Sequence, residues 1–157
     1  MVLSLLKTLV AIVVVTVALG LGRTWQEENS RQQQDFLAGT LPSPAPDGVY
    51  MGSVPGHTFS WIGKKFDASH ERGINVFNDG TGTTTERYPF MTAVGKGVRD
   101  TNLDVMKIDY DMPGNPFWLK FILDEIVQVA PGQYLGKMHV RIIPGYPFTL
   151  LFFHLRK

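Results

Sequence analysis

Residues 133–156 read QYLGKMHVRIIPGYPFTLLFFHLR, and this stretch decides the fold class. Two runs rich in β-branched and aromatic residues, 133–142 and 148–156, flank Pro144-Gly145, a pair that favours a tight turn. Both alternating faces of the second run are mainly apolar. We therefore expect a strand covered on both sides, by the protein interior on one side and by a partner, an upstream helix or lipid on the other.

The same pattern of short apolar runs separated by Gly and Pro extends over residues 48–157. Turn residues recur at 78–80, 113–115 and 131–132, as hairpins require. About eight strands in this length favour a small closed antiparallel β-barrel, with a β-sandwich as the alternative. Residues 117–129 also fit a helix. The expected strands are 49–54, 57–67, 73–78, 86–94, 103–109, 118–129, 133–142 and 148–156.

Residues 1–22 form an almost wholly apolar segment with one charge, Lys7. A cleaved signal peptide fits, with Ala18-Leu19-Gly20 before the cut. A transmembrane helix of about 20 residues fits as well if Lys7 reaches the interface. We favour an uncleaved signal-anchor in the cytoplasmic (inner) membrane, a single-pass span with the C-terminal domain on the periplasmic or extracytoplasmic side.

Residues 23–38 lack Pro and are rich in Gln and Glu until Gly39, which predicts a helical stalk that continues the membrane helix as an exposed spacer. Trp25 lies where an aromatic anchor at the membrane interface belongs. Residues 39–47, with three prolines, predict a stiff extended linker. The expected domain organisation is therefore an anchor over 1–22, a stalk over 23–38, a linker over 39–47 and a barrel over 48–157.

The overall composition excludes several function classes. The 157 residues carry a net charge of +1, so no basic surplus exists for nucleic acid. The chain has no cysteine, which excludes disulfides, thiolate metal sites and thiol catalysis.

Several short motifs carry a resemblance to a known family. Residues 47–52 (DGVYMG), 55–57 (PGH) and 61–67 (WIGKKFD) resemble the GXWXG-motif family of bacterial lipocalin-like proteins. The C-terminal half resembles the domain of unknown function that accompanies that motif. The matching stretches there are 106–111, 124–126, 134–138 and 147–156.

The resemblance implies a lipocalin-like barrel and an apolar ligand, and it implies no catalysis. Tyr50 replaces the tryptophan of the motif. In lipocalin-type proteins that ring stacks under an arginine, so the resemblance suggests Arg141 or Arg156 for this role.

The chain offers few residues for chemistry. Its four histidines form no metal-binding spacing, so we expect no metal and no cofactor. His57 follows a Pro-Gly turn, where a structural role is favoured over a catalytic one. His154 lies in the last strand as a core residue, with haem ligation as the sharper alternative. The acids Asp100, Asp104, Asp109 and Asp111 fit solvated strand ends, while Asp124 and Glu125 are expected to pair with Lys120, Lys137 or Arg141.

Aromatic side chains supply the remaining candidates, with the densest apolar patch at residues 116–122. We expect partner or membrane contacts at Trp25, Phe36, Phe117, Trp118 and Phe121. The expected ligand-binding residues are Tyr50, His57, Trp61, Trp118, Arg141 and His154.

Three functions compete. The first is a noncatalytic accessory subunit, whose helix and barrel dock on or stabilise a larger membrane-protein complex. The second is a carrier or sensor that holds a lipid, pigment or other apolar molecule in the barrel. The third is an isomerase or hydratase acting on a lipid-like substrate, with His57 or an aspartate as base. The sequence favours the first.

Overall fold

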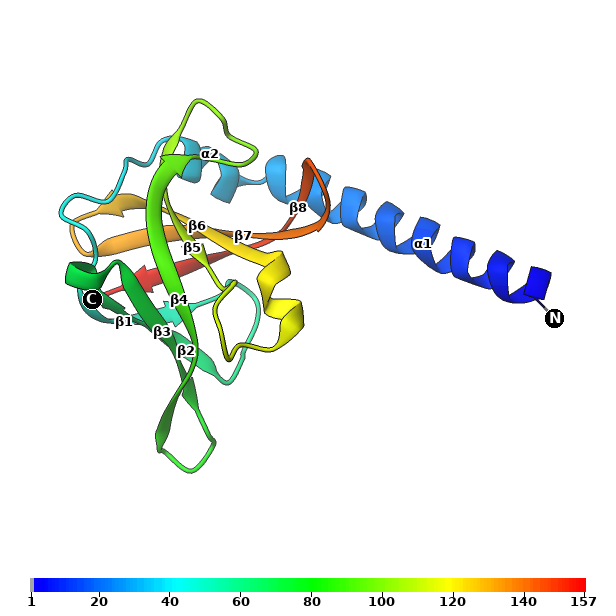
Figure 1. Cartoon of the computed structure of the whole chain (residues 1–157). Helices are drawn as coiled ribbons and strands as arrows, with labels where there is room; N and C mark the ends of the chain where they lie inside the picture. The colour runs from blue at the N-terminus through cyan, green and yellow to red at the C-terminus, as the bar shows by residue number, and fades with distance from the viewer. Residues whose placement is uncertain (1) are drawn as a thin grey trace.

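The computed structural model describes residues 2–157 and shows a β-barrel from which one long helix projects (Figure 1). The helices α1 (Val2–Glu28) and α2 (Arg31–Leu37) precede the strands. Two short 3-10 helices, η1 (Ala68–His70) and η2 (Phe117–Phe121), lie between strands. The strands are β1 (Gly48–Ser53), β2 (Trp61–Asp67), β3 (Arg72–Asn78), β4 (Thr84–Lys96), β5 (Asp104–Asp109), β6 (Ile122–Ala130), β7 (Gln133–Ile143) and β8 (Tyr146–Arg156).

Each strand pairs antiparallel with the next, and β1 pairs with β8, so the eight strands form a closed barrel. The predicted barrel is confirmed, and the sandwich alternative is wrong. Because successive strands run in opposite directions, the connections fall at two ends of the barrel. We call one the η2 end (residues 54–60, 79–83, 110–121 and 144–145) and the other the linker end (residues 39–47, 68–71, 97–103 and 131–132).

The predicted strands agree with the observed ones within a few residues, with two exceptions. Residues 57–60 lie outside β2 because the His57 N–H donates to the Val54 carbonyl at 3.1 Å and closes a tight turn. The ambiguous segment 117–129 contains both structures, η2 followed by β6. The helical and the strand pattern were therefore each correct for part of it.

Aromatic rings fill the linker half of the barrel interior. Tyr134, Tyr50, Phe66, Phe90 and Tyr110 form a continuous chain of edge-to-face contacts, with centroids of successive rings 5.3–5.8 Å apart. Such pairs are favourable because the positive edge of one ring meets the negative face of the next. The chain of rings fills the barrel toward the linker end and finishes at Tyr110, which lines the space at the η2 end.

The predicted exposed stalk is wrong, although its helical character is confirmed. The helix breaks at residues 29–30, and α2 packs on the outer face of β6, β7 and β8. Phe36 is fully buried, with its ring 5.9 Å from that of Phe152, so the expected partner contact at Phe36 is a contact within the chain. The helices thus cover the second apolar face of β8 that the sequence predicts. The outer cluster consists of Phe36, Val105, Val127, Leu135 and Phe152.

A buried polar network fixes the end of α1 to the barrel. Glu28 pairs with Arg99, and the Thr24 hydroxyl accepts from the Thr149 N–H at 3.0 Å. Beneath them Lys137 Nζ lies 2.8 Å from Asp100 Oδ2. Because buried charges require partners, these contacts hold the helix in one orientation relative to the barrel.

Several predicted ion pairs differ from those observed. Asp100 is not a solvated strand end, since its carboxylate accepts hydrogen bonds from Lys137 and from Gln33 of α2. Glu125 lies opposite Lys137 in the sheet, but its carboxylate is 3.3 Å from His139 Nε2 and forms no ion pair with that lysine among the described residues. The prediction missed these pairs because α2 and the end of α1 cover this wall, which brings side chains from distant elements together. Arg141 pairs with Asp109, Lys137 also lies 3.7 Å from Glu28, and Asp124 pairs with Lys64.

Most of α1 makes no contact with the barrel. Residues 4–16 are exposed, and the helix is long and apolar enough to cross a membrane or to serve as a signal sequence. The sharper assignment to a cytoplasmic-membrane anchor stays a prediction.

The segment 39–47 is extended as predicted, but it is tied to the barrel rather than spacing it from the helices. Thr40 pairs with Gln128 on β6, and the Ser43 N–H donates to the Gln128 side chain at 3.0 Å. Asp47 accepts from the Ala68 N–H at 3.1 Å. The helices and the barrel are therefore one packed unit, joined across the linker end.

Candidate ligand-binding cavity

A cavity of about 440 Å³ occupies the barrel at the η2 end. Its walls come from β2, β3, β4, β6, β7 and β8, and η2 and the β1–β2 turn form its mouth. The volume falls within the range of about 300–1,000 Å³ that is typical of small-molecule sites. The apolar lining consists of Val54, Phe59, Trp61, Phe77, Tyr88, Trp118, Leu119, Ile122, Met138, Leu151 and Phe153.

Four polar side chains, which we call the polar cluster, form the floor of the cavity: Lys64, Asn75, Tyr110 and Asp124. The Lys64 ammonium donates to Asn75 Oδ1 at 2.9 Å, to Asp124 Oδ2 at 2.9 Å and to the Tyr110 hydroxyl. The Tyr110 hydroxyl donates to Asp124 Oδ2 at 2.8 Å. The cluster is therefore a buried ion pair whose members also bond to neutral neighbours.

The backbone of β2 explains why Lys64 points inward. Lys64 and Lys65 are adjacent, so a period of two places one on each face of the sheet. Lys65 is exposed and pairs with Glu86 at 2.9 Å, while Lys64 is buried. The backbone of β2 also lies close to that of β1 at Gly63. Only glycine fits there, because a Cβ would lie 2.1 Å from the Tyr50 carbonyl oxygen.

Asn75 lies opposite Lys64 of β2 and so faces the same side of the sheet, while the register shift on its other side leaves Tyr88 of β4 as the bulged residue. Asn75 Nδ2 donates to the Tyr88 carbonyl at 3.1 Å, and Trp61 Nε1 donates to Asn75 Oδ1 at 3.1 Å. Tyr88 has φ +62°, an uncommon conformation for a bulky residue, and its ring meets that of Trp118 with centroids 6.4 Å apart. The local strain at Tyr88 thus accompanies a ring that lines the cavity.

Burial sets the ionisation of the cluster. Desolvation lowers the pKa of Lys64, and the Asp124 carboxylate opposes that shift. Four aromatic rings, including those of Phe90 and Phe153, lie 5.1–5.5 Å from Lys64 Nζ and favour its charged form. Desolvation and the Asp124 carboxylate raise the pKa of Tyr110 well above its usual value. Tyr110 is therefore a neutral donor beside a charged pair.

The hydrogen-bonding capacity of the cluster is largely used. The three protons of the Lys64 ammonium have three acceptors. The Lys64 ammonium and the Tyr110 hydroxyl both donate to Asp124 Oδ2, and within residues 2–157 the other carboxylate oxygen, Oδ1, accepts no side-chain hydrogen bond. The cavity floor thus offers an acceptor to a bound molecule more readily than a donor.

Two of the six predicted ligand-binding residues line the cavity, Trp61 and Trp118. Tyr50 lies deeper, in the chain of rings, and Lys157 Nζ lies 5.5 Å over its ring. The expected stacking of Arg141 or Arg156 on this ring is therefore wrong. Lys157 reaches it because β8 ends beside β1 at the linker end.

The other three predicted residues lie outside the cavity. His57 is exposed in the β1–β2 turn, stacked on Phe59, and Arg141 is held by Asp109 on the barrel wall. His154 points away from the interior, toward α2, because Phe153 and Leu155 take the inward positions of β8. The position of His154 contradicts haem ligation inside the barrel.

The cluster residues were missed by sequence reasoning. One signal was present in the sequence: Lys64 and Lys65 are adjacent in the strand between Trp61 and Phe66. Because successive side chains point to opposite faces, one of these two lysines had to face the apolar interior. The signal for Asp124 is weaker. Its neighbours Leu123 and Glu125 are as buried as Asp124, so the alternation of faces along the strand does not single it out.

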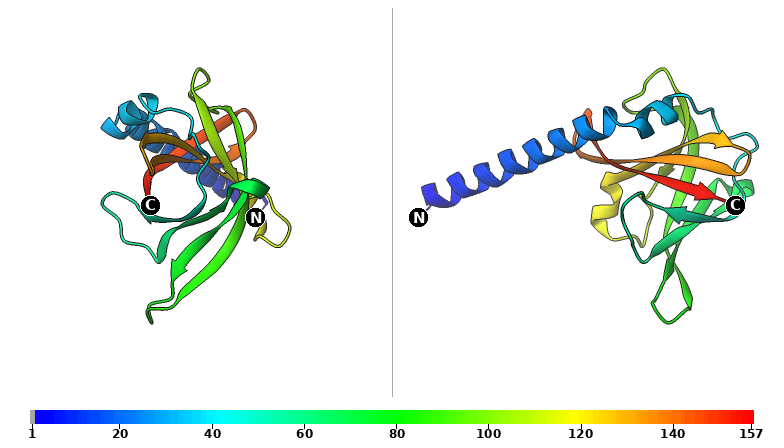
Figure 2. Two further views of the ribbon diagram at one scale, coloured as in Figure 1. Left: turned by 90° about the vertical axis from the view of Figure 1, so that its left-hand side faces the viewer. Right: turned by 180° about the vertical axis from the view of Figure 1, so that it is seen from behind.

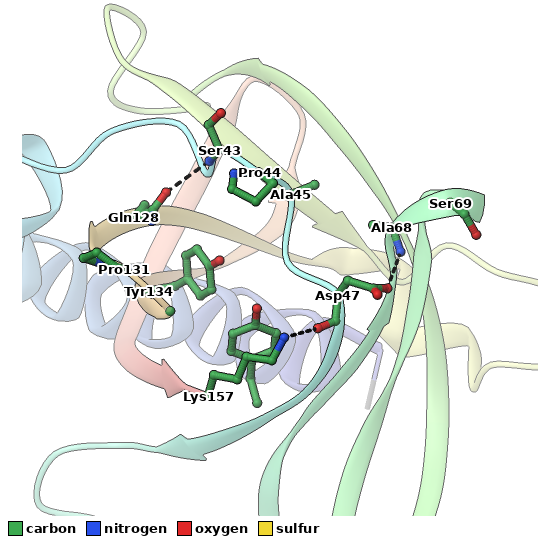
Figure 3. A pocket seen from close by; sticks show the side chains of 12 residues that line it. Ser43, Pro44, Ala45, Asp47, Ala68, Ser69, Gln128, Pro131, Tyr134 and Lys157 are labelled. Carbon is green, nitrogen blue, oxygen red and sulfur yellow. Dashed lines mark hydrogen bonds between the residues drawn. The ribbon is translucent and has the colours of Figure 1, made fainter.

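A larger hollow of about 750 Å³ lies at the linker end (Figure 3). Linker residues and the ends of β6, β7 and β8 surround it, and Lys157 Nζ donates to the Asp47 carbonyl at 3.1 Å across it. Tyr50 and Tyr134, whose rings are in edge-to-face contact, line this hollow on the side of the barrel core. It is a surface hollow beneath the linker and carries no buried charged group, so the smaller cavity is the better candidate site.

Comparisons with known proteins give information about the fold only. No protein-family model and no curated protein matches the chain, so the resemblance to the GXWXG-motif family stays a prediction. A crystal structure of a protein from Thermomonospora curvata matches with a TM-score of 0.56 and 18% identity, over 94% of this chain and 96% of its own. At this identity the similarity supports the barrel with its N-terminal helix and says nothing of activity.

Proposed function

We propose that this protein is a membrane-anchored, noncatalytic carrier or sensor that binds one small apolar molecule in the barrel. The observation that carries the proposal is the cavity itself: aromatic and aliphatic walls around a single polar cluster. Sites for apolar molecules commonly combine such walls with a few polar groups that fix orientation.

The cluster favours a neutral ligand with a hydroxyl group. The charge of Lys64 is balanced by Asp124 at 2.9 Å, and its protons are already donated. A ligand carboxylate would meet the Asp124 carboxylate without a spare donor, at a cost in free energy. A ligand hydroxyl would instead donate to Asp124 Oδ1.

The geometry also favours binding over catalysis. In the described chain no histidine is among the residues that line the cavity, and His57 lies in an exposed turn. Asp124 is the aspartate of the cavity, and its Oδ2 already accepts from Lys64 and from the Tyr110 hydroxyl. This arrangement favours a role for Asp124 in hydrogen bonding to a ligand over the role of base in an isomerase or hydratase.

The accessory-subunit hypothesis and the location of the domain outside the cytoplasm stay predictions. The exposed surface of α1 and the exposed ring of Trp25 are equally suited to lipid and to another membrane subunit. Purification of the full chain in mild detergent, followed by identification of proteins that accompany it, tests this hypothesis separately.

Ligand binding is tested with the full chain in mild detergent. We expect a long-chain alcohol to bind at least about tenfold more tightly than the fatty acid of equal length, measured by titration calorimetry. Leu151→Trp, which fills the cavity, should abolish binding, while Val94→Trp on the exposed face of β4 should not. The proposal is overturned if the unmodified chain binds neither compound, or if the Leu151→Trp variant still binds both compounds with equal affinity.

A further inference from the structure

Apolar side chains are exposed at the η2 end of the barrel, where the cavity opens. We call five of them the rim: Phe59, Phe117, Trp118, Ile142 and Tyr146. Phe117 and Trp118 in η2 are 77% and 49% exposed. Exposed aromatic residues gathered at one end of a barrel indicate a contact surface, since isolated ones are ordinary but a group is not.

The apolar helix α1 leaves the barrel at the same end. A Cβ at Gly20 would lie 2.9 Å from the Phe148 ring, and Arg23 Nε donates to the Leu150 carbonyl at 2.7 Å. These residues of β8 follow directly after the β7–β8 turn, which belongs to the η2 end. Residues 4–19 then project beyond that end, and η2 lies on the side of the barrel nearest the N-terminus (Figures 1 and 2).

The connection between helix and barrel is rigid rather than a flexible tether. The helix is continuous from Val2 to Glu28, and its last turns carry the buried contacts of Thr24 and Glu28. Residues 4–21 extend about 27 Å at about 1.5 Å per residue, close to the roughly 30 Å of a bilayer core. A membrane around these residues has its surface at the level where the barrel begins.

Interfacial residues mark that same level. Trp25 is 71% exposed on α1, one turn after Gly22, and Arg23 lies beside it. In η2, Lys120 is exposed with Nζ 5.2 Å over the Phe121 ring. Tryptophan, tyrosine and cationic side chains favour the headgroup layer, where an apolar body and a polar tip are both satisfied.

We propose that the η2 end of the barrel lies in the headgroup layer of the phospholipid bilayer, with the rim in contact with lipid, and that the cavity exchanges its ligand with the bilayer. The occupant of the rim is lipid because the exposed apolar part of α1 leaves the barrel at the end that carries the rim. The exchange of ligand rests on the proposed function, whereas the contact of the rim with lipid does not. A molecule that leaves the bilayer through this mouth reaches the cavity without crossing water.

The absence of cysteine permits a direct test by labelling. Phe117→Cys in the rim and Val94→Cys on β4 provide two exposed positions that differ in their distance from the η2 end. The full chain carrying an environment-sensitive fluorophore at either position is reconstituted into phosphatidylcholine–phosphatidylglycerol vesicles. We expect a blue shift and quenching by nitroxide lipids at position 117 and neither at position 94.

Three outcomes overturn the contact with lipid: equal water exposure of both labels, equal quenching of both, or an apolar signal at 117 that requires a co-purified protein. Ligand exchange is read separately, as the transfer of a fluorescent long-chain alcohol from vesicles. Phe117→Asp should slow transfer by about tenfold while leaving the affinity in detergent within about twofold. Unchanged transfer overturns the route through the bilayer, whereas failure of the unmodified chain to bind the alcohol in detergent overturns the proposed function instead.

Discussion

Lys64 Nζ on β2 lies 2.9 Å from Asp124 Oδ2 on β6, and both side chains are almost completely buried in the barrel. The two strands are not neighbours in the sheet, so the ion pair spans the interior. It divides the barrel into a packed aromatic half and a half with a cavity. Both the stability of the fold and the chemistry of the candidate site therefore depend on this pair.

Removing one partner should be costly. Asp124→Asn leaves the Lys64 ammonium without a counter-charge, and we expect a loss of about 3–5 kcal/mol in the free energy of unfolding. The matched control is Glu86→Gln, which breaks the exposed pair with Lys65 and should cost less than about 1 kcal/mol. Urea unfolding of the two variants measures the difference, and equal losses would contradict a buried charged pair.

Packing of α2 on the barrel makes a second prediction. Phe36→Ala removes a fully buried ring from the outer cluster and should lower the free energy of unfolding by about 3–5 kcal/mol. Leu37→Ala in the same helix truncates an exposed side chain and should change it by less than about 0.5 kcal/mol. If both variants are as stable as the unmodified chain, α2 is not part of the folded unit.

The barrel interior leaves no room beside Gly136. A Cβ there would lie 2.1–2.5 Å from three atoms of the Phe153 ring, so Gly136→Ala should cost about 1–3 kcal/mol through overpacking. Gly95→Ala is the matched control in another strand, where the nearest atoms belong to the flexible Lys107 side chain at 3.5 Å or more. Thermal unfolding of both variants distinguishes a specific close approach from a general cost in strands.

His154 provides a prediction about pH. Burial lowers its pKa below the usual 6.5, with repulsion from Arg156 adding to the shift and Asp35 opposing it. As the pH falls below 6.5 the unfolded chain binds a proton at this residue and the folded chain does not, so the free energy of unfolding should decrease. The decrease should end once the pH passes below the folded pKa.

The His154→Gln variant should lose this part of the dependence on pH. Urea unfolding at a series of pH values measures both chains, and an NMR titration should place the His154 midpoint below 6.5. Parallel curves for the two proteins would show that His154 does not contribute.

The fold could be predicted from sequence because its signals are local. Pro131-Gly132 and Pro144-Gly145 mark the turns between β6, β7 and β8, and the runs between them match strand propensity. The burial of Phe36 was not predictable in this way, because its surroundings in sequence are polar and its partner Phe152 lies far away in the chain. Local composition describes a helix, but not the surface on which it packs.

Only a small part of the site was predicted, for a related reason. Trp61 and Trp118 were expected because large aromatic residues commonly line cavities. The polar cluster depends on register: the inward position of Lys64 and its pairing with Asn75 across β2 and β3 decide which polar side chains meet. A shift of one residue in β2 would place Lys65 in the barrel, and composition alone cannot distinguish the two registers.

Phe117 and Trp118 are adjacent in η2 and both exposed, yet only Trp118 lines the cavity. This difference separates ligand binding from contact with the membrane. In detergent, Trp118→Ala should weaken the binding of a long-chain alcohol by about tenfold, since it removes aromatic surface from the mouth. Phe117→Ala should leave that affinity within about twofold. Titration calorimetry with the two variants measures both effects, and equal losses would mean that η2 supports the site as a whole rather than through the ring of Trp118.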